Sequence, residues 1–228
     1  MTQKNYVGKH FDVIQFKLGG NKCILTYEKA LLKAVPLVKE GLLKSSKLLS
    51  TKNDLIINVS STKSKFVKND MDGVTALTMN GYTMFLSINE NAAKWRQFLA
   101  GTVAHEFNHA IRFQRIDQKD RTLLNNIVSE GLAQCFEYQL TGSLRPWSTA
   151  ITRDQARTIW VKLKEKLDVE SRDMQDRIFI KQKDKEFPHW SGYTVGYLLI
   201  KKRLEELKMD WEKVMCMKSK VIIGDDTF

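Results

Sequence analysis

The segment of residues 103–113, VAHEFNHAIRF, constrains the fold more than any other part of the chain. It places His105, Glu106 and His109 within residues 91–113, where apolar side chains recur at steps of three and four. This period predicts one long amphipathic helix. Glu106 falls on its apolar stripe and His109 borders that stripe. Burial of a carboxylate is costly unless a partner offsets the lost hydration, so the fold has to provide a partner for Glu106.

Two kinds of partner are compatible with this pattern. The first is an internal hydrogen bond between Glu106 and a histidine. The second is a metal ion, because residues four apart project from the same face of a helix, so that His105 and His109 can bind one ion. The glutamate between them then lies beside the open coordination position, where it can take a proton from a metal-bound water.

A metal site of the HExxH type needs a third protein ligand. The extended class HExxHxxGxxH is excluded, because Arg112 and Arg115 stand at its two further positions. Another class takes a glutamate from the following helix. Residues 121–140 predict such a helix, with Glu130 on a mostly apolar face and Gly131 allowing close helix packing. Glu130 is therefore the candidate third ligand, and its alternative role is that of a surface charge.

Four sequence blocks together resemble the gluzincin metallopeptidases, and more narrowly the YjaZ-like family of predicted zinc-dependent proteases. They are DGVTALT (72–78), AHEFNHAIR (104–112), SEGLAQ (129–134) and GYTVGYLL (192–199), in this order. The resemblance implies one Zn²⁺ per chain on His105, His109 and Glu130, and hydrolysis of a peptide or protein substrate with Glu106 as general base. One position departs from the pattern. Many gluzincins have an acidic residue four positions after the ligand glutamate, whereas this chain has Gln134, an amide that can still accept a hydrogen bond from a zinc-binding histidine.

Peptide hydrolysis also needs a donor for the developing oxyanion and a place for the substrate. The segment FPHWSGYTVGY offers His189 and Tyr193 as donors; their alternatives are a loop histidine and a tyrosine in helix packing. Metallopeptidases commonly hold the substrate as an extra strand on a sheet edge. Residues 83–89 lead directly into the helix of the site, so we expect them to form this edge. The expected substrate-facing residues are Thr83, Phe85 and Ser87.

The remaining pattern predicts an α+β fold, in which a small antiparallel β-sheet is followed by a mainly helical half. The resemblance implies that this fold has a zincin-like metallopeptidase architecture. Expected strands are residues 11–18, 54–60, 73–79 and 83–89, with turns at 19–20 and 80–82. Expected helices are residues 27–49, kinked or split at Pro36, and then 91–113, 121–140, 153–167, 193–207 and 210–217. We expect a single domain over residues 1–228, with the sheet in about 1–90 and the helical part in about 91–228.

Charge and composition restrict the partners. The chain has 37 Lys and Arg against 26 Asp and Glu, a net charge of +11, but no motif of a nucleic-acid-binding protein, so no nucleic-acid partner is expected. The first 16 residues lack the apolar core of a signal peptide, and no apolar run approaches the ~20 residues that span a bilayer. With three separate cysteines, these features predict a cytoplasmic protein without a membrane partner. The oligomeric state stays open.

The alternative function is a zinc-binding regulatory or pseudo-enzyme module without peptidase activity.

Overall fold

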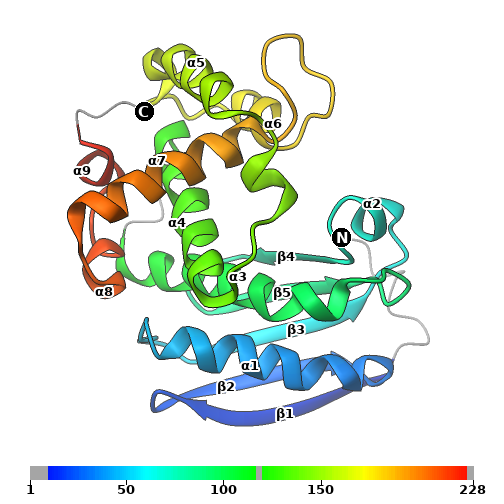
Figure 1. The fold of residues 1–228 in the computed structure, drawn as a ribbon. Helices are drawn as coiled ribbons and strands as arrows, with labels where there is room; N and C mark the ends of the chain where they lie inside the picture. Colours follow the sequence, from blue (N-terminus) through cyan, green and yellow to red (C-terminus); the bar gives the residue numbers. More distant parts are fainter. Residues whose placement is uncertain (1–9, 117–119, 225–228) are drawn as a thin grey trace. The chain divides into compact units, whose positions relative to one another are not determined.

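The computed structural model describes residues 10–116 and 120–224 (Figure 1). Residues 1–9, part of the segment without a signal-peptide core, lie outside the described residues. The chain forms two compact units, Met1–Gln114 and Arg115–Phe228. The first unit contains the whole β-sheet and nearly all of the helix with the HExxH motif.

The first unit is built on a five-stranded mixed sheet with the strand order β1-β2-β3-β5-β4. The strands are β1 (Phe11–Leu18), β2 (Asn21–Glu28), β3 (Leu55–Ser61), β4 (Val74–Thr78) and β5 (Thr83–Ile88). The pairs β1–β2 and β4–β5 are antiparallel, whereas β2–β3 and β3–β5 are parallel. The α+β class is confirmed, but the expected all-antiparallel sheet is wrong. A helical crossover between β2 and β3 makes a parallel pair possible.

The strand β5 lies inside the sheet, with β3 on one side and β4 on the other. The predicted β4–β5 hairpin is confirmed, and Asn80 closes its turn by accepting hydrogen bonds from the backbone N–H groups of Tyr82 and Thr83. However, the outer strand of this hairpin is β4. The expectation that β5 forms the open edge, with Thr83, Phe85 and Ser87 facing a substrate strand, is therefore wrong, because both backbone edges of β5 are already paired.

The strand β2, which follows β1 directly, was not predicted from the sequence pattern. Gly19 and Gly20 adopt positive φ angles of 58° and 92° and return the chain as β2. The predicted helix of residues 27–49 starts later, because β2 continues to Glu28 and is followed by the 3₁₀ helix η2 (Lys29–Ala34) and by α1 (Val35–Ser46). Pro36 lies in the first turn of α1, where its missing N–H leaves no helical hydrogen bond unmade.

The HExxH motif lies in α3 (Trp95–Arg115), which packs beside α1 on one face of the sheet (Figure 1). A Cβ atom on Gly41 of α1 would lie 2.6 Å from the carbonyl oxygen of Ala100, so a glycine is needed where α1 and α3 cross. Asn89 stabilises the turn before α3, because its side chain accepts from the backbone N–H of Asn91. A five-residue helix, α2 (Lys65–Asn69), connects β3 to β4.

The second unit is helical and, in the part that the structure describes, contains the helices predicted from the apolar period together with three short ones that were not predicted. They are α4 (Leu123–Thr141), η3 (Pro146–Thr149), α5 (Arg153–Leu163), η4 (Lys164–Lys166), α6 (Arg172–Phe179), α7 (Ser191–Leu207), α8 (Trp211–Val214) and α9 (Ser219–Ile223). The unpredicted helices are η3, α6 and α9. Of these, α6 is the longest, and its eight residues bury only Met174, Ile178 and Phe179. Within the described part of the chain, no helix is both long and apolar enough to cross a membrane.

The helices α4 and α7 cross at two glycines. A Cβ atom on Gly196 of α7 would lie 2.5 Å from the carbonyl oxygen of Ile127, and one on Gly131 of α4 would overlap the backbone of Gly196. Only glycines therefore fit at this crossing. The close helix approach expected at Gly131 is made here with α7, so two of the four sequence blocks, SEGLAQ and GYTVGYLL, meet within the helical unit.

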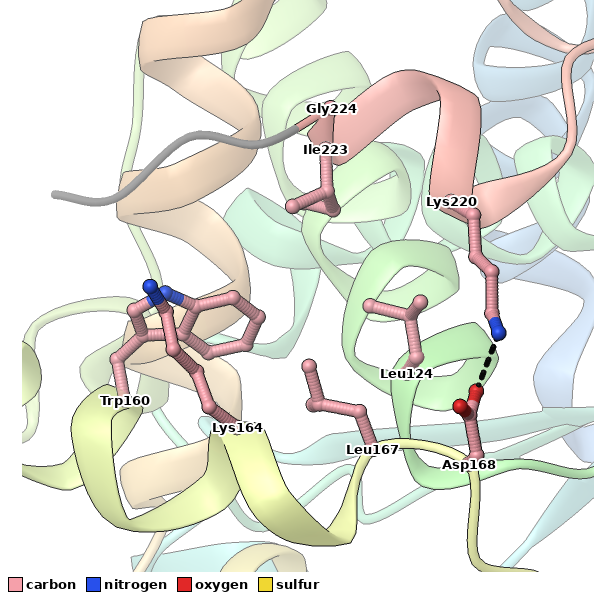
Figure 2. Close-up of a pocket in the computed structure, with 8 residues that line it drawn as sticks. All are labelled: Leu124, Trp160, Lys164, Leu167, Asp168, Lys220, Ile223 and Gly224. Atoms are coloured by element: carbon pink, nitrogen blue, oxygen red, sulfur yellow. Dashed lines mark ion pairs between the residues drawn. The ribbon is translucent and has the colours of Figure 1, made fainter.

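The helical unit also contains a cavity of about 440 Å³ (Figure 2). Its wall combines apolar side chains such as Leu124 and Leu167 with Lys164 and an exposed ion pair between Lys220 and Asp168 at 2.8 Å. None of the site residues predicted from the sequence lines this cavity. It is therefore separate from the residues considered below.

Candidate metal centre

The two histidines of the HExxH motif face each other from successive turns of α3. The Nε2 atoms of His105 and His109 are 3.2 Å apart, and the ring planes meet at 73°. Both side chains are buried, with exposed fractions of 8% and 9%. The i, i+4 spacing places the rings on one face of the helix, and their converging Nε2 atoms define a single point that both nitrogens can reach.

This geometry fits a tetrahedral metal ion. With Zn–N distances of about 2.0–2.1 Å and tetrahedral angles, two ligand nitrogens lie about 3.3 Å apart, close to the 3.2 Å between the two Nε2 atoms. A hydrogen bond between a protonated and an unprotonated ring nitrogen has a similar length, so metal content distinguishes the two arrangements. On geometry and on donor type, the pair fits zinc.

Glu106 lies between these histidines and is also buried, with 7% of its surface exposed. Its carboxylate oxygen Oε2 accepts a hydrogen bond of 2.7 Å from the hydroxyl of Thr78, the last residue of β4. The same hydroxyl lies 3.0 Å from the backbone carbonyl oxygen of Glu106. Thr78 therefore supplies a partner for the buried carboxylate. Sequence reasoning missed Thr78 as a site residue, although it ends the block DGVTALT.

In the helical unit, Glu130 lies half-buried on α4, whose N-cap is Thr122. Gln134, one turn later, donates from its amide nitrogen to the backbone carbonyl oxygens of Glu130 at 3.2 Å and Tyr193 at 3.0 Å. Its amide oxygen accepts from the hydroxyl of Ser148 at 2.6 Å. Gln134 was expected to accept from a zinc-binding histidine. The structure instead engages both ends of its amide within the helical unit, where it ties the turn of Glu130 to the start of α7.

Of the two oxyanion candidates, Tyr193 lies in the first turn of α7 and His189 just before it. The half-buried ring of Tyr193 contacts Phe179 edge-on, with 4.9 Å between ring centroids. His189 stacks on Trp190 at 4.1 Å, and Trp190 adopts a left-handed backbone with φ 63°. The link through Gln134 brings the backbone of Tyr193 close to the helical turn that carries Glu130.

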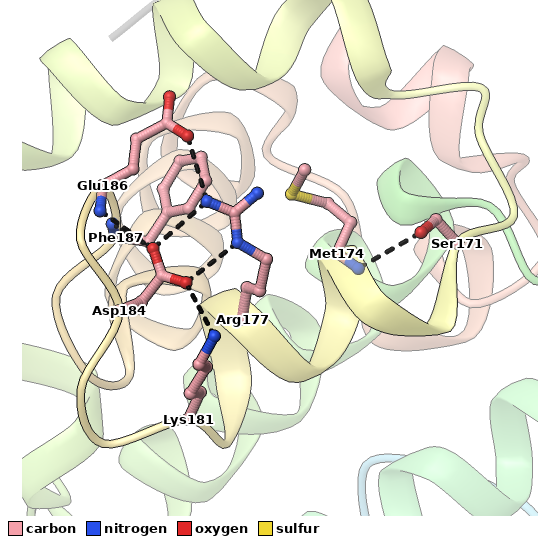
Figure 3. A network of polar contacts seen from close by, with 7 residues as sticks. All are labelled: Ser171, Met174, Arg177, Lys181, Asp184, Glu186 and Phe187. Atoms are coloured by element: carbon pink, nitrogen blue, oxygen red, sulfur yellow. Dashed lines mark hydrogen bonds and ion pairs between the residues drawn. The ribbon is translucent and has the colours of Figure 1, made fainter.

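The loop before His189 is held by an ion-pair network around Asp184 (Figure 3). Asp184 accepts from Arg177 at 2.9 Å, from Lys181 at 3.4 Å and from the backbone N–H groups of Glu186 and Phe187. These hydrogen bonds, led by that from Arg177, hold the pKa of Asp184 well below its usual range. The network fixes the loop that leads to α7 and to both oxyanion candidates.

The two buried cysteines are not candidate nucleophiles. Cys23 and Cys135 are buried free thiols, and Cys216 is an exposed free thiol. Burial raises the pKa of Cys23 to about 12 and that of Cys135 further still. A thiol nucleophile needs a lowered pKa, so the two buried cysteines are protonated and unreactive.

Comparison with known proteins agrees with this geometry. Residues 36–224 match the model of the family described as "Predicted Zn-dependent protease (DUF2268)". The uncharacterized protein YjaZ of Bacillus subtilis is 29% identical over 124 residues, which cover 48% of this chain and 44% of YjaZ. The crystal structure of an aminopeptidase N family protein from Idiomarina loihiensis matches 95% of this chain and 43% of its own, with a TM-score of 0.51 and 12% identity.

These matches differ in what they establish. The structural match is at low identity and shows the fold alone, a zincin-like one. The chain spans less than half the length of each of these two proteins. The family model, in contrast, covers most of the chain, including the HExxH helix and the helix with Glu130. The chain therefore belongs to the DUF2268 family of predicted zinc-dependent proteases.

Proposed function

We propose that this protein is a zinc metallopeptidase in which His105, His109 and Glu130 bind one Zn²⁺ and Glu106 is the general base. Together these three side chains offer one ligand atom each to a single ion, the donor set of two imidazoles and a carboxylate that catalytic zinc sites use. The observation that carries the proposal is the pair of Nε2 atoms 3.2 Å apart, with a buried carboxylate between the two histidines on the chain.

The proposed roles follow from the positions of the side chains. A bound zinc ion would lower the pKa of a water molecule toward about 7 and polarise the substrate carbonyl. Glu106 accepts the proton of the attacking water and passes it to the leaving amine. Tyr193 or His189 donates a hydrogen bond to the oxyanion. Within the described residues the open sheet edges are β1 and β4, and β4 carries Thr78, so a peptide would bind along β4.

The decisive experiment is the substitution Glu106→Gln, because the amide keeps the size of the side chain but cannot accept a proton. We expect the variant to retain stoichiometric zinc by mass spectrometry and to lose about 10²–10⁴-fold in peptide cleavage rate. The exposed Glu205→Gln is the matched control and should cleave like the wild type. A zinc-loaded wild type that cleaves no member of a broad peptide library would refute the peptidase and favour a zinc-binding regulatory module. Equal rates for wild type and Glu106→Gln would refute the general base.

A further inference from the structure

We infer that Thr78 is the positioning residue of the general base, an inference that rests on the function proposed for Glu106. Thr78 ends β4, and its hydroxyl reaches the carboxylate of a residue that lies 28 positions later in the chain. Both side chains are nine-tenths buried, with exposed fractions of 8% and 7%. The 2.7 Å separation from Oε2 is that of a strong hydrogen bond to a charged acceptor.

The position of the hydroxyl is set by the sheet. Thr78 pairs with Met84 of the interior strand β5, and the backbone N–H of Met79 donates to the carbonyl oxygen of Thr83 at 3.0 Å. The end of β4 is thus anchored on both sides of the Thr78 side chain. A glutamate has three rotatable bonds, and a donor on a rigid strand restricts them to the orientation in which Oε2 meets the hydroxyl.

The hydroxyl of Thr78 does more than donate to the backbone carbonyl oxygen of Glu106. The carbonyl oxygen of Glu106, 3.0 Å from the hydroxyl, lies within α3 and accepts the ordinary helical hydrogen bond there. The side chain of Thr78 is therefore not needed to satisfy this carbonyl, whereas the buried carboxylate does need a donor. Because Thr78 engages Oε2, the other oxygen, Oε1, is left to take the proton of the attacking water.

A hydroxyl suits a base that gains and loses a proton. It donates to Oε2 while the carboxylate is charged. Once Oε1 has taken the proton, Oε2 is the carbonyl oxygen of a carboxylic acid and still accepts from the hydroxyl, whose hydrogen can also turn to the backbone carbonyl 3.0 Å away. Thr78 can thus hold Glu106 in one orientation throughout the reaction without itself exchanging a proton with the substrate.

Two substitutions separate positioning from packing. Thr78→Val keeps the shape and removes the hydroxyl, whereas Thr78→Ser keeps the hydroxyl and removes a methyl group. We expect Thr78→Val to lower kcat about 10- to 100-fold, the equivalent of one hydrogen bond to a charged group, with KM within about twofold and zinc content unchanged. Thr78→Ser should restore most of kcat. Thr26→Val, on the interior strand β2 and half-exposed, is the matched control and should behave like the wild type.

A second readout needs no turnover. Acetohydroxamic acid binds zinc and gives up its hydroxyl proton to a neighbouring base, so its affinity for the zinc-loaded protein, measured by calorimetry, reports on the orientation of Glu106. We expect Thr78→Val to weaken its binding about tenfold or more. We also expect the double variant Thr78→Val/Glu106→Gln to bind no more weakly than Glu106→Gln alone, because coupled residues are non-additive.

The outcomes separate this inference from the proposed function. If the wild type cleaves no peptide, the peptidase proposal fails. The double-mutant cycle formed by the affinities of the wild type, the two single variants and the double variant for acetohydroxamic acid still decides the role of Thr78. Additive effects in that cycle, or wild-type affinity and kcat in Thr78→Val, would overturn the inference. So would loss of zinc from Thr78→Val, or a Thr78→Ser variant as impaired as Thr78→Val, because either result would make Thr78 a packing residue.

Discussion

At the scale of single residues, the metal hypothesis depends on three side chains that can be removed one at a time. We expect His105→Ala, His109→Ala and Glu130→Ala each to lose most of the bound zinc, because a three-ligand protein site with one ligand missing binds the ion far more weakly. Metal content after gel filtration measures the loss, and far-UV circular dichroism checks that the helices persist. His10→Ala, which changes an exposed histidine, should keep full zinc. Full occupancy in Glu130→Ala would exclude Glu130 as the third ligand.

The other acidic side chain of α4 is unsuitable as a control. Glu137 is buried, with 3% of its surface exposed, and it faces the buried guanidinium of Arg145 at 4.0 Å. Removal of one member of a buried pair leaves an uncompensated charge and is strongly destabilising. A loss of zinc from Glu137→Ala would therefore report on folding and not on ligation.

Tyr193 can be tested by removing its hydroxyl alone. We expect Tyr193→Phe to keep its zinc and to lose ~10²–10³ in kcat, the usual effect of one missing oxyanion donor. Its ring contacts with Phe179 and Trp147 need no hydroxyl and should persist. The matched control is Tyr138→Phe on α4, an exposed tyrosine. If kcat is unchanged, Tyr193 serves packing only, and His189→Ala becomes the test of the second candidate.

At the scale of elements, the position of α7 depends on two kinds of contact. The glycine crossing with α4 sets the distance between the two backbones, and the hydrogen bond from Gln134 to the carbonyl of Tyr193 sets the register of the first turn. Both use residues of the blocks SEGLAQ and GYTVGYLL. The spacing within these blocks therefore reflects helix packing as well as the chemistry that we propose for Glu130 and Tyr193.

The loop that leads to α7 should depend on pH through Asp184. Its pKa is lowered in the folded protein, chiefly because Arg177 donates to it, so its contribution to stability is present above the ordinary carboxyl pKa of about 3.9 and is lost as the pH falls below that value. We expect Asp184→Asn to have a lower Tm than the wild type at pH 7. The difference should shrink as the pH falls from about 4 towards 2.

This prediction is checked by thermal unfolding at a series of pH values. The control is Asp70→Asn, which changes an exposed aspartate after α2 and should give no such pH-dependent difference. A Tm difference for Asp184→Asn that stays constant from pH 7 to pH 2 would show that the ion pair with Arg177 does not stabilise the fold.

At the scale of the whole molecule, zinc binding should be visible as stability. A ligand that binds only the native state stabilises it by RT ln(1 + [L]/Kd), about 4 kcal/mol at a free zinc concentration 1,000 times Kd. We therefore expect the zinc-loaded protein to unfold at a higher temperature than the chelator-treated protein in differential scanning calorimetry. His10→Ala should keep this increment and Glu130→Ala should lose it. An equal Tm with and without zinc would contradict a native-state zinc site.

The sequence by itself determined what depends on local spacing. The i, i+4 histidines, the glutamate between them and the apolar period of α3 identify the candidate site, because a helix places such residues on one face whatever its surroundings. The β4–β5 hairpin and most helices of the second unit follow from short-range patterns in the same way. The four blocks that resemble the family were also readable without a structure, and the family match agrees with them.

The tertiary structure decided what depends on residues distant in sequence. Strand order is a property of pairing between distant segments, so only the fold could show that β5 is interior and that β4 is an edge. The partner of Glu106 comes from a strand 28 positions away. Likewise, Gln134 is engaged by Ser148 and Tyr193, and Gly131 is needed against Gly196. No periodicity encodes these partners, because each is selected by the packing of separate elements into a shared core.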